Sequence, residues 1–161
     1  MSQILVLAWG NPSRGDDALG PTFAECAKAE LKEGPHSVEF LTDYQLQPEH
    51  ATDLQGRDVV LFVDASTTCQ APFTFAPVTA AHDHTFTTHA MTPAALLAAY
   101  HDAFGGDPPQ GYLLAIRGEH FVLGEPMSAT AIRHLDAAVA FFNDRLARTP
   151  TVEWASWAHY T

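Results

Sequence analysis

The stretch VLAWGNPSRGDDALGP, residues 6–21, decides the fold of this 161-residue chain. An apolar run ends at Gly10 and leads into a turn that carries two adjacent acids, Asp16 and Asp17. From Leu19 onward, apolar side chains recur with helical spacing. A continuously apolar strand that is followed directly by a helix is typical of an α/β sheet whose strands are buried on both faces.

The rest of the chain continues this alternation. Further apolar runs with strand character span residues 37–43, 59–66, 73–78 and 111–118. Helices are expected to begin at Thr92-Pro93 and at Ser128, where N-cap residues stand. We therefore expect one domain over residues 1–161, folded as a three-layer α/β/α sandwich with a mostly parallel twisted sheet of about five strands.

Two details of the last third of the chain follow from the same pattern. The final helix should carry its apolar face on the side chains of Ile132, Leu135, Val139, Phe142 and Leu146. The tail that follows, with two tryptophans and no clear period, either packs back on the domain or frays.

Composition excludes several classes of protein. A net charge of -11 with only eight scattered Lys and Arg residues argues against nucleic acid and against an anionic membrane surface as partners. Cys26 and Cys69 do not suggest a disulfide framework, and Cys26 falls on the apolar side of a helix. The N-terminus lacks the basic region of a signal peptide, and no apolar run is long enough to span a bilayer. A cytoplasmic location is expected.

The turn after the first strand does not have the residues of a phosphate cradle. The fingerprint G-x-G-x-x-G is absent, and Asp16 stands where a Walker loop needs Lys. Two carboxylates would also repel a phosphate. Helix capping explains one of the acids, with a cost of about 1 kcal/mol for Asp16→Asn if Asp16 is the cap. Capping leaves the other acid unexplained, and also Asp64.

Asp64 closes the apolar run at residues 59–63, so it should lie at the carboxyl end of a strand, where α/β proteins bind their ligands. His82, His84 and His89 precede the Thr92-Pro93 helix start, and His89 is the nearest to it. Two carboxylates and an imidazole at one rim would form an open site for a borderline metal such as Ni, Zn or Cu. His82 and His84 are equally consistent with solvated loop residues or with a pair of metal ligands.

These residues resemble the motifs of the hydrogenase maturation proteases. The family opens with a strand, G-N, a variable stretch and D-[DE]-x-x-G, which reads GNPSRGDDALG in this chain. An Asp that closes a strand, LFVDA, and a His before a helix, TTHAMTPAALL, complete the pattern. The continuation DYQLQPEHATDL, in place of a glycine-rich turn, is similar to the branch that serves NAD-linked or bidirectional cytoplasmic hydrogenases.

The resemblance implies a catalytic and metal-binding set of Asp17, Asp64 and His89, with Asp16 in a supporting role. Many family members have Glu where Asp17 stands, and Gln where Ala90 follows the His. The implied activity is the removal of a C-terminal extension from the [NiFe]-hydrogenase large-subunit precursor after nickel insertion. Nickel is supplied by the substrate and acts as the recognition signal, and zinc or cadmium are expected to occupy the same site.

The residues are also compatible with two other functions. A zinc-dependent exopeptidase-like hydrolase would need further ligands from His82 or His84. A nickel-sensing maturation chaperone would bind the precursor without cutting it. Serine or cysteine protease chemistry is not favoured, because Ser13, Ser66 and Cys69 lack the motifs that activate a nucleophile.

Overall fold

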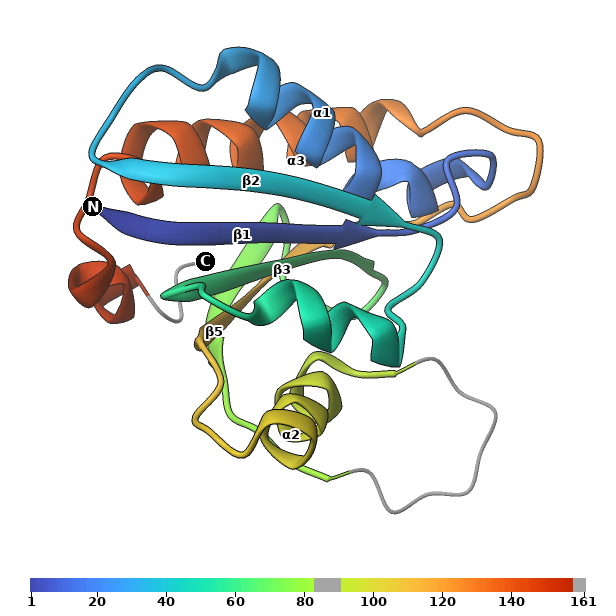
Figure 1. The fold of residues 1–161 in the computed structure, drawn as a ribbon. Coiled ribbons are helices and arrows are strands. Elements are labelled where there is room, and N and C mark those ends of the chain that lie inside the picture. The colour runs from blue at the N-terminus through green and yellow to red at the C-terminus, as the bar shows by residue number, and fades with distance from the viewer. Residues whose placement is uncertain (83–90, 158–161) are drawn as a thin grey trace.

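The computed structural model describes residues 1–82 and 91–157, and in this part of the chain five strands form a single sheet (Figure 1). The strands are β1 (Ser2–Trp9), β2 (His36–Asp43), β3 (Val59–Ser66), β4 (Phe73–Val78) and β5 (Gln110–Arg117). Their order in the sheet is β2-β1-β3-β5-β4. The first four of these are parallel to one another, and β4 alone runs antiparallel, to its neighbour β5. The predicted α/β fold is confirmed.

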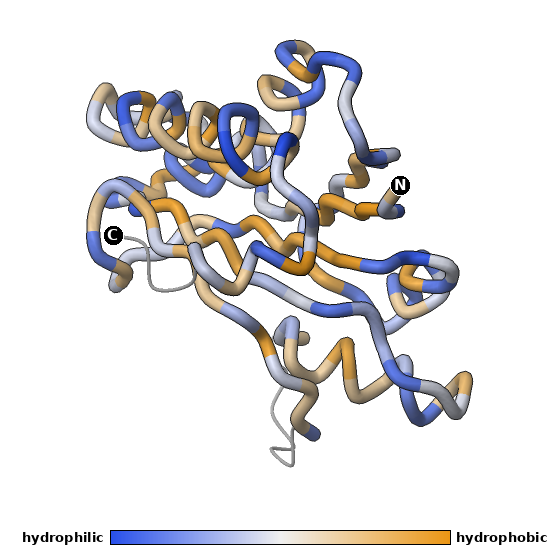
Figure 2. Tube along the Cα trace, turned by 90° about the vertical axis from the view of Figure 1, so that its left-hand side faces the viewer, coloured by the Kyte–Doolittle hydropathy of each residue, from blue (hydrophilic) through white to orange (hydrophobic). Residues whose placement is uncertain are grey.

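Helices cover both faces of the sheet. The α-helices α1 (Leu19–Glu30) and α3 (Ala129–Phe141) lie on one face, whereas the 3-10 helix η2 (Pro48–Leu54) and α2 (Pro93–Phe104) lie on the other (Figure 1). Each face has its own buried apolar cluster, and hydrophobic residues follow the strands between the two (Figure 2). The side chains of β1 alternate between these clusters, which explains why its sequence is apolar without a break.

The predicted caps of α2 and α3 are confirmed. The side chain of Thr92 accepts the N–H of Ala95 at 3.1 Å, and Ser128 accepts the N–H of Ala131 at the same distance. The prediction that Asp16 or Asp17 caps the first helix is wrong. Both acids lie in a 3-10 turn, η1 (Gly15–Ala18), and α1 begins after it without a side-chain cap.

The C-terminal segment packs back on the domain. After α3 the chain continues as a π-helical turn, η3 (Phe142–Leu146), and a 3-10 helix, η4 (Thr151–Trp157). Trp154 of η4 is fully buried and donates its indole N–H to the carbonyl of Leu146 at 3.1 Å. Ile132 is 43% exposed, contrary to prediction, because three residues of helix turn by about 300° and place it at the margin of the Leu135 face.

Two further observations complete the fold. The helix η2 lies in the connection between β2 and β3, where no helix was predicted. Within residues 1–82 and 91–157, no helix combines the length and the hydropathy required to cross a membrane.

Candidate functional site

The strand order places a topological switch point between β1 and β3. From β1 the chain passes through α1 to β2 on one side, and then returns through η2 to β3 on the other side of β1. In open α/β sheets, ligands bind at the carboxyl ends of the strands at such a point. Asp17 lies in the turn that follows β1, and Asp64 lies near the carboxyl end of β3. The structure therefore brings these two predicted site residues to the same rim, on the right of Figure 1.

The position of Asp17 is fixed by the turn that carries it. Its Oδ2 accepts the backbone N–H of Asn11 at 2.8 Å, and its own N–H donates to the carbonyl of Arg14 at 3.0 Å. Gly10 has a φ of 150°, and a Cβ atom there would lie 2.0 Å from the carbonyl oxygen of Asp17. A Cβ at Gly20 would lie 2.3 Å from the carbonyl oxygen of Trp9. Both glycines of the motif are thus needed for close backbone contact.

Among the described residues, few groups around Asp64 favour its charge. Because Val60 and Phe62 of β3 belong to the apolar cluster on the α2 face, the alternation of the strand places Asp64 on the same side, as Trp9 is on β1. Burial raises the pKa of Asp64 to about 7, and the negative charge of Asp17 adds to this rise. Hydrogen bonding from the Ala65 backbone and the Trp9 side chain opposes the rise only partly. Among the described residues, no Lys, Arg or His forms an ion pair with Asp17 or Asp64.

Asp16 is surrounded by donors. It is fully buried and accepts the backbone N–H groups of Glu119, His120 and Ser128 at 2.7–3.0 Å, together with the Ser128 hydroxyl at 3.0 Å. Burial alone would raise the pKa of Asp16, but these hydrogen bonds outweigh it and hold the pKa below its usual value. Asp16 therefore anchors the loop at residues 118–128 to the turn that carries Asp17.

The predicted histidine ligand, His89, lies outside the described residues, and so does His84. His82 is described, and its Nε2 lies 2.9 Å from Oδ2 of Asp102 on the exposed surface of α2. Met91, at which the described chain resumes, packs against the apolar cluster that contains Trp9. Within the described ranges, no group of three His, Cys, Asp or Glu side chains is arranged to hold a metal ion.

The candidate nucleophiles Ser66 and Cys69 have structural partners. The Ser66 hydroxyl accepts the backbone N–H groups of Thr68 and Cys69 at 3.2 and 3.0 Å. Burial raises the pKa of the Cys69 thiol, which donates to the carbonyl of Ala115 at 3.5 Å. No histidine of the described residues forms a hydrogen bond with either group. The geometry gives no support to a serine or cysteine mechanism.

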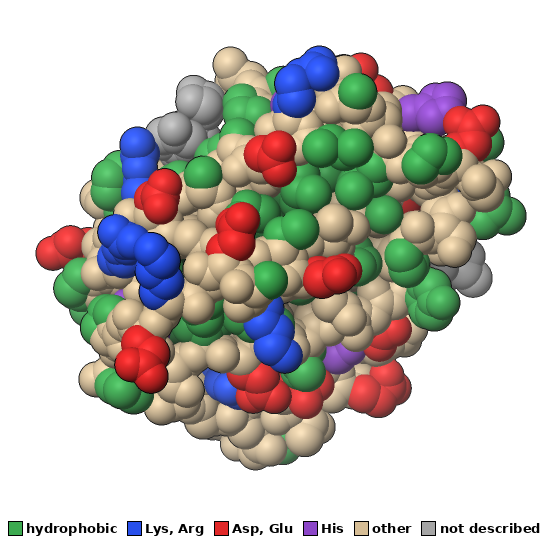
Figure 3. Space-filling view, turned by 90° about the horizontal axis from the view of Figure 1, so that it is seen from above, with side chains coloured by type: hydrophobic (Ala, Val, Ile, Leu, Met, Phe, Trp, Pro, Cys, Tyr) green, Lys and Arg blue, Asp and Glu red, His purple; other side chains and the backbone are tan. Residues whose placement is uncertain are grey.

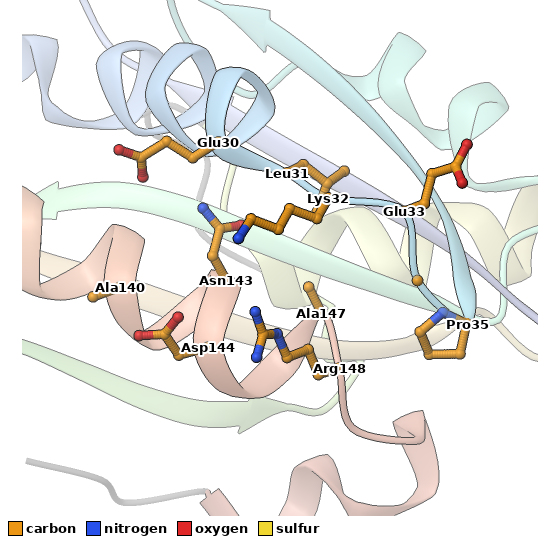
Figure 4. A pocket seen from close by; sticks show the side chains of 11 residues that line it. Glu30, Leu31, Lys32, Glu33, Pro35, Ala140, Asn143, Asp144, Ala147 and Arg148 are labelled. Carbon is orange, nitrogen blue, oxygen red and sulfur yellow. The ribbon is translucent and has the colours of Figure 1, made fainter.

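The described residues line cavities at both ends of the sheet. The cavity shown in Figure 4, about 510 Å³, lies between the end of α1 and η3, and another of about 680 Å³ is lined by the starts of β1, β3 and β5. Both lie at the amino ends of the strands, away from Asp17 and Asp64. A smaller pocket of about 240 Å³ lies at the carboxyl rim and is lined by Gly10, Pro12, Pro21, Thr42, Asp43 and Tyr44. This pocket was not predicted from the sequence. The one sequence feature that points to it is Asp43, an acid at the end of a predicted strand.

The fold is that of known peptidases. The chain is similar to the [NiFe] hydrogenase maturation protease HycI from Thermococcus kodakarensis KOD1, with 22% identity, a TM-score of 0.68 and coverage of 89% of this chain and 91% of the other. It is also similar to the hydrogenase maturating endopeptidase HybD from E. coli, with 23% identity, a TM-score of 0.64 and coverage of 85% and 87%. An endopeptidase from Escherichia coli, at 20% identity, has a TM-score of 0.68 over 94% and 99%.

Sequence comparison alone does not find these proteins. No protein-family model matches the chain, and no curated protein sequence is significantly similar to it. At 20–23% identity the structural likeness establishes the fold, and the chain has the fold of the hydrogenase maturation proteases.

Proposed function

We propose that this protein is an endopeptidase that removes the C-terminal extension of a [NiFe]-hydrogenase large-subunit precursor after nickel insertion. The observation that carries the proposal is the meeting of Asp17 and Asp64 at the switch point between β1 and β3. The solved structures that share this fold include proteins named as hydrogenase maturation proteases. The turn that positions Asp17 also depends on the glycines of the family motif.

In this proposal Asp17, Asp64 and His89 bind the nickel that the precursor already holds. Two carboxylates that repel one another, with no cationic partner among the described residues, form a favourable place for a divalent cation. Carboxylate oxygens and an imidazole nitrogen are suitable ligands for nickel, zinc and cadmium. The substrate's metal then polarises the scissile carbonyl or activates a water molecule. The protein supplies ligands and orientation, and the metal makes the substrate recognisable.

Three finer assignments belong to the same proposal. The reaction takes place in the cytoplasm, and zinc or cadmium substitutes for nickel at the site in binding experiments. The segment DYQLQPEHATDL, which passes from the end of β2 into η2, supports assignment to the branch that serves NAD-linked or bidirectional hydrogenases.

The test uses purified protein with nickel-loaded and nickel-free precursor. Mass spectrometry of the precursor should show one cut near the C-terminus of the loaded form and no cut in the nickel-free form. Activity should fall as the pH drops below about 6–7, because His89 must be a neutral imidazole to bind metal. Efficient cutting of the nickel-free form would remove nickel from recognition. No cutting of either form, together with tight binding of the loaded form, would favour the chaperone function.

A further inference from the structure

The pocket at the carboxyl rim adjoins Asp17 directly. Its wall includes Gly10, whose backbone packs against the carbonyl oxygen of Asp17. The next residue, Asn11, donates its N–H to the Asp17 carboxylate at 2.8 Å. Pro12 and Pro21 form two of its sides and Tyr44 a third. A polypeptide bound at Asp17 would therefore place a neighbouring side chain over this pocket.

Hydrogen bonds hold the wall of the pocket in place. Asp43 accepts the N–H of Tyr44 on Oδ1 at 2.7 Å, and its Oδ2 lies 3.2 Å from Nε2 of His50. His50 is buried and accepts the N–H of Gln47 on Nδ1 at 2.8 Å, so a neutral His50 carries its proton on Nε2, the nitrogen that faces Asp43. Gly10 in turn donates its N–H to the carbonyl of Asp43 at 3.0 Å. The pocket is therefore formed before any substrate arrives.

The same contacts determine what the pocket favours. Both oxygens of the Asp43 carboxylate already have partners, which weakens the case for a basic side chain in the pocket. The rest of the lining consists of the proline rings of Pro12 and Pro21 and the aromatic ring of Tyr44, together with Gly10 and Thr42. A volume of about 240 Å³ is below the ~300–1,000 Å³ of pockets that take drug-sized ligands, and it suits a single side chain.

Exposed apolar side chains stand on both sides of the turn that carries Asp17. Tyr44 is 69% exposed on the side of β2, and Leu123 is 64% exposed on the other side. Leu123 is linked to the turn by a β-bridge with Arg14, and Gly124 donates its N–H to the carbonyl of Ser13 at 2.7 Å. Hydrophobic side chains are visible at this end of the molecule in Figure 3. Apolar groups gathered around a functional rim are typical of a binding surface for a polypeptide.

We propose that the pocket formed by Pro12, Pro21 and Tyr44 receives an apolar side chain of the substrate polypeptide next to the scissile bond. Tyr44 is then a specificity-determining residue, which contacts the substrate and takes no part in the chemistry. The inference rests on the proposed function, because Asp17 marks the place of the cut. Its occupant is the precursor chain itself, since the pocket is continuous with the turn that presents Asp17.

The experiment combines enzyme variants with precursor variants. Tyr44→Ala removes the ring, Tyr44→Phe keeps it, and Val152→Ala changes an exposed apolar side chain on η4, at the amino end of the strands. The nickel-loaded precursor is used unchanged, and with Ser or Lys in place of the first apolar residue on each side of the cut. Cleavage by mass spectrometry gives kcat and KM, and the affinity of each pair is measured separately by binding.

Tyr44→Ala should raise KM and the dissociation constant of the unchanged precursor about 10-fold, with little change in kcat, as expected for a lost apolar contact. Tyr44→Phe and Val152→Ala should behave like the unmodified enzyme. The Ser precursor should bind unmodified enzyme and Tyr44→Ala equally weakly, because the two changes remove the same contact.

Equal affinity of unmodified enzyme and Tyr44→Ala for the unchanged precursor would overturn the inference, whether or not cleavage is seen. Tighter binding of the Lys precursor would also overturn it and assign the pocket to a basic side chain opposite Asp43. Absence of cleavage by unmodified enzyme concerns the proposed function alone, because the binding comparison still decides the role of the pocket.

Discussion

Asp16 and Asp64 lie at the same rim of the sheet, and their surroundings move the pKa values of the two carboxyl groups in opposite directions. Asp16 is fully buried among three backbone N–H groups and a hydroxyl, which keep it ionised. Asp64 is partly buried near a second carboxylate, Asp17, and burial together with that charge raises its pKa to about 7. The first arrangement satisfies a negative charge, whereas in the second the described residues supply few partners for the two carboxylates, so ionising both of them is unfavourable.

This difference in hydrogen-bond donors distinguishes Asp16, an acid with a structural role, from Asp17 and Asp64, the acids proposed to act in function. A carboxylate with four donors stabilises the fold and has no capacity left for a ligand. Carboxylates held close together with few donors destabilise the fold unless a cation binds, which is typical of sites kept for function. Substitutions at these acids should therefore have opposite effects on processing and on stability.

The largest effect is expected on catalysis from Asp17→Asn. Cleavage of nickel-loaded precursor should fall by more than about 100-fold, because even the groups that only support a metal ligand cost ~10–100-fold when they are lost. The unfolding free energy should change by no more than about 0.5 kcal/mol, since the amide oxygen still accepts the N–H of Asn11. Processing assays and urea unfolding measure the two quantities, and retained processing would contradict the ligand assignment.

Asp16→Asn is the matched variant one residue away, and its main effect should be on stability. An amide NH₂ would face at least one buried donor, and the charge-assisted hydrogen bonds would weaken, so a loss of about 3 kcal/mol or more is expected. This exceeds the ~1 kcal/mol of a helix cap. Urea unfolding at neutral pH checks it, and a loss no greater than that of Asp17→Asn would mean that the Asp16 contacts contribute little.

Asp64→Asn should stabilise the metal-free protein while it abolishes processing. The pKa of Asp64 is raised on folding, so the folded state holds its proton more tightly, and the wild-type protein loses stability as the pH rises from about 4 to about 7. At ~1.4 kcal/mol for each pH unit between the two pKa values, the loss reaches up to about 4 kcal/mol above pH 7. The variant lacks this loss. Unfolding measured at pH 5 and pH 8 should show its advantage growing with pH, and a less stable variant at pH 8 would contradict it.

The smallest effects are expected at the side chains outside the acidic rim. Ser66→Ala should cost about 1 kcal/mol of stability, because the N–H groups of Thr68 and Cys69 lose their acceptor. Processing should be unchanged. Cys69→Ala should also remain active, and thiol reagents should act slowly because burial keeps the thiol protonated at neutral pH. Rapid inactivation by a thiol reagent that Cys69→Ala prevents would return a cysteine nucleophile to the mechanism.

Short-range patterns in the sequence predicted the strands and helices and the shared rim of Asp17 and Asp64. Alternating apolar runs predicted the strands and helices, and Thr92 and Ser128 marked two helix starts, because caps and periodicity depend on near neighbours in the chain. The positions of Asp17 and Asp64 at strand ends predicted one rim, since parallel strands finish on the same side of a sheet. The prediction that Ile132 lies on the buried face of the last helix was wrong, because periodicity gives the direction of an apolar helix face but not its width.

The role of Asp16, the direction of the Asp64 pKa shift and the pocket beside Tyr44 depend on contacts between segments that are far apart in the sequence. The donors to Asp16 lie 103 to 112 residues away in the chain. The pocket joins residues of three segments, which are the turn after β1, the first turn of α1 and the end of β2. Several of these contacts are made by backbone N–H groups, which nearly every residue carries. Backbone donors cannot be recognised from residue types, so these contacts are seen only in the folded chain.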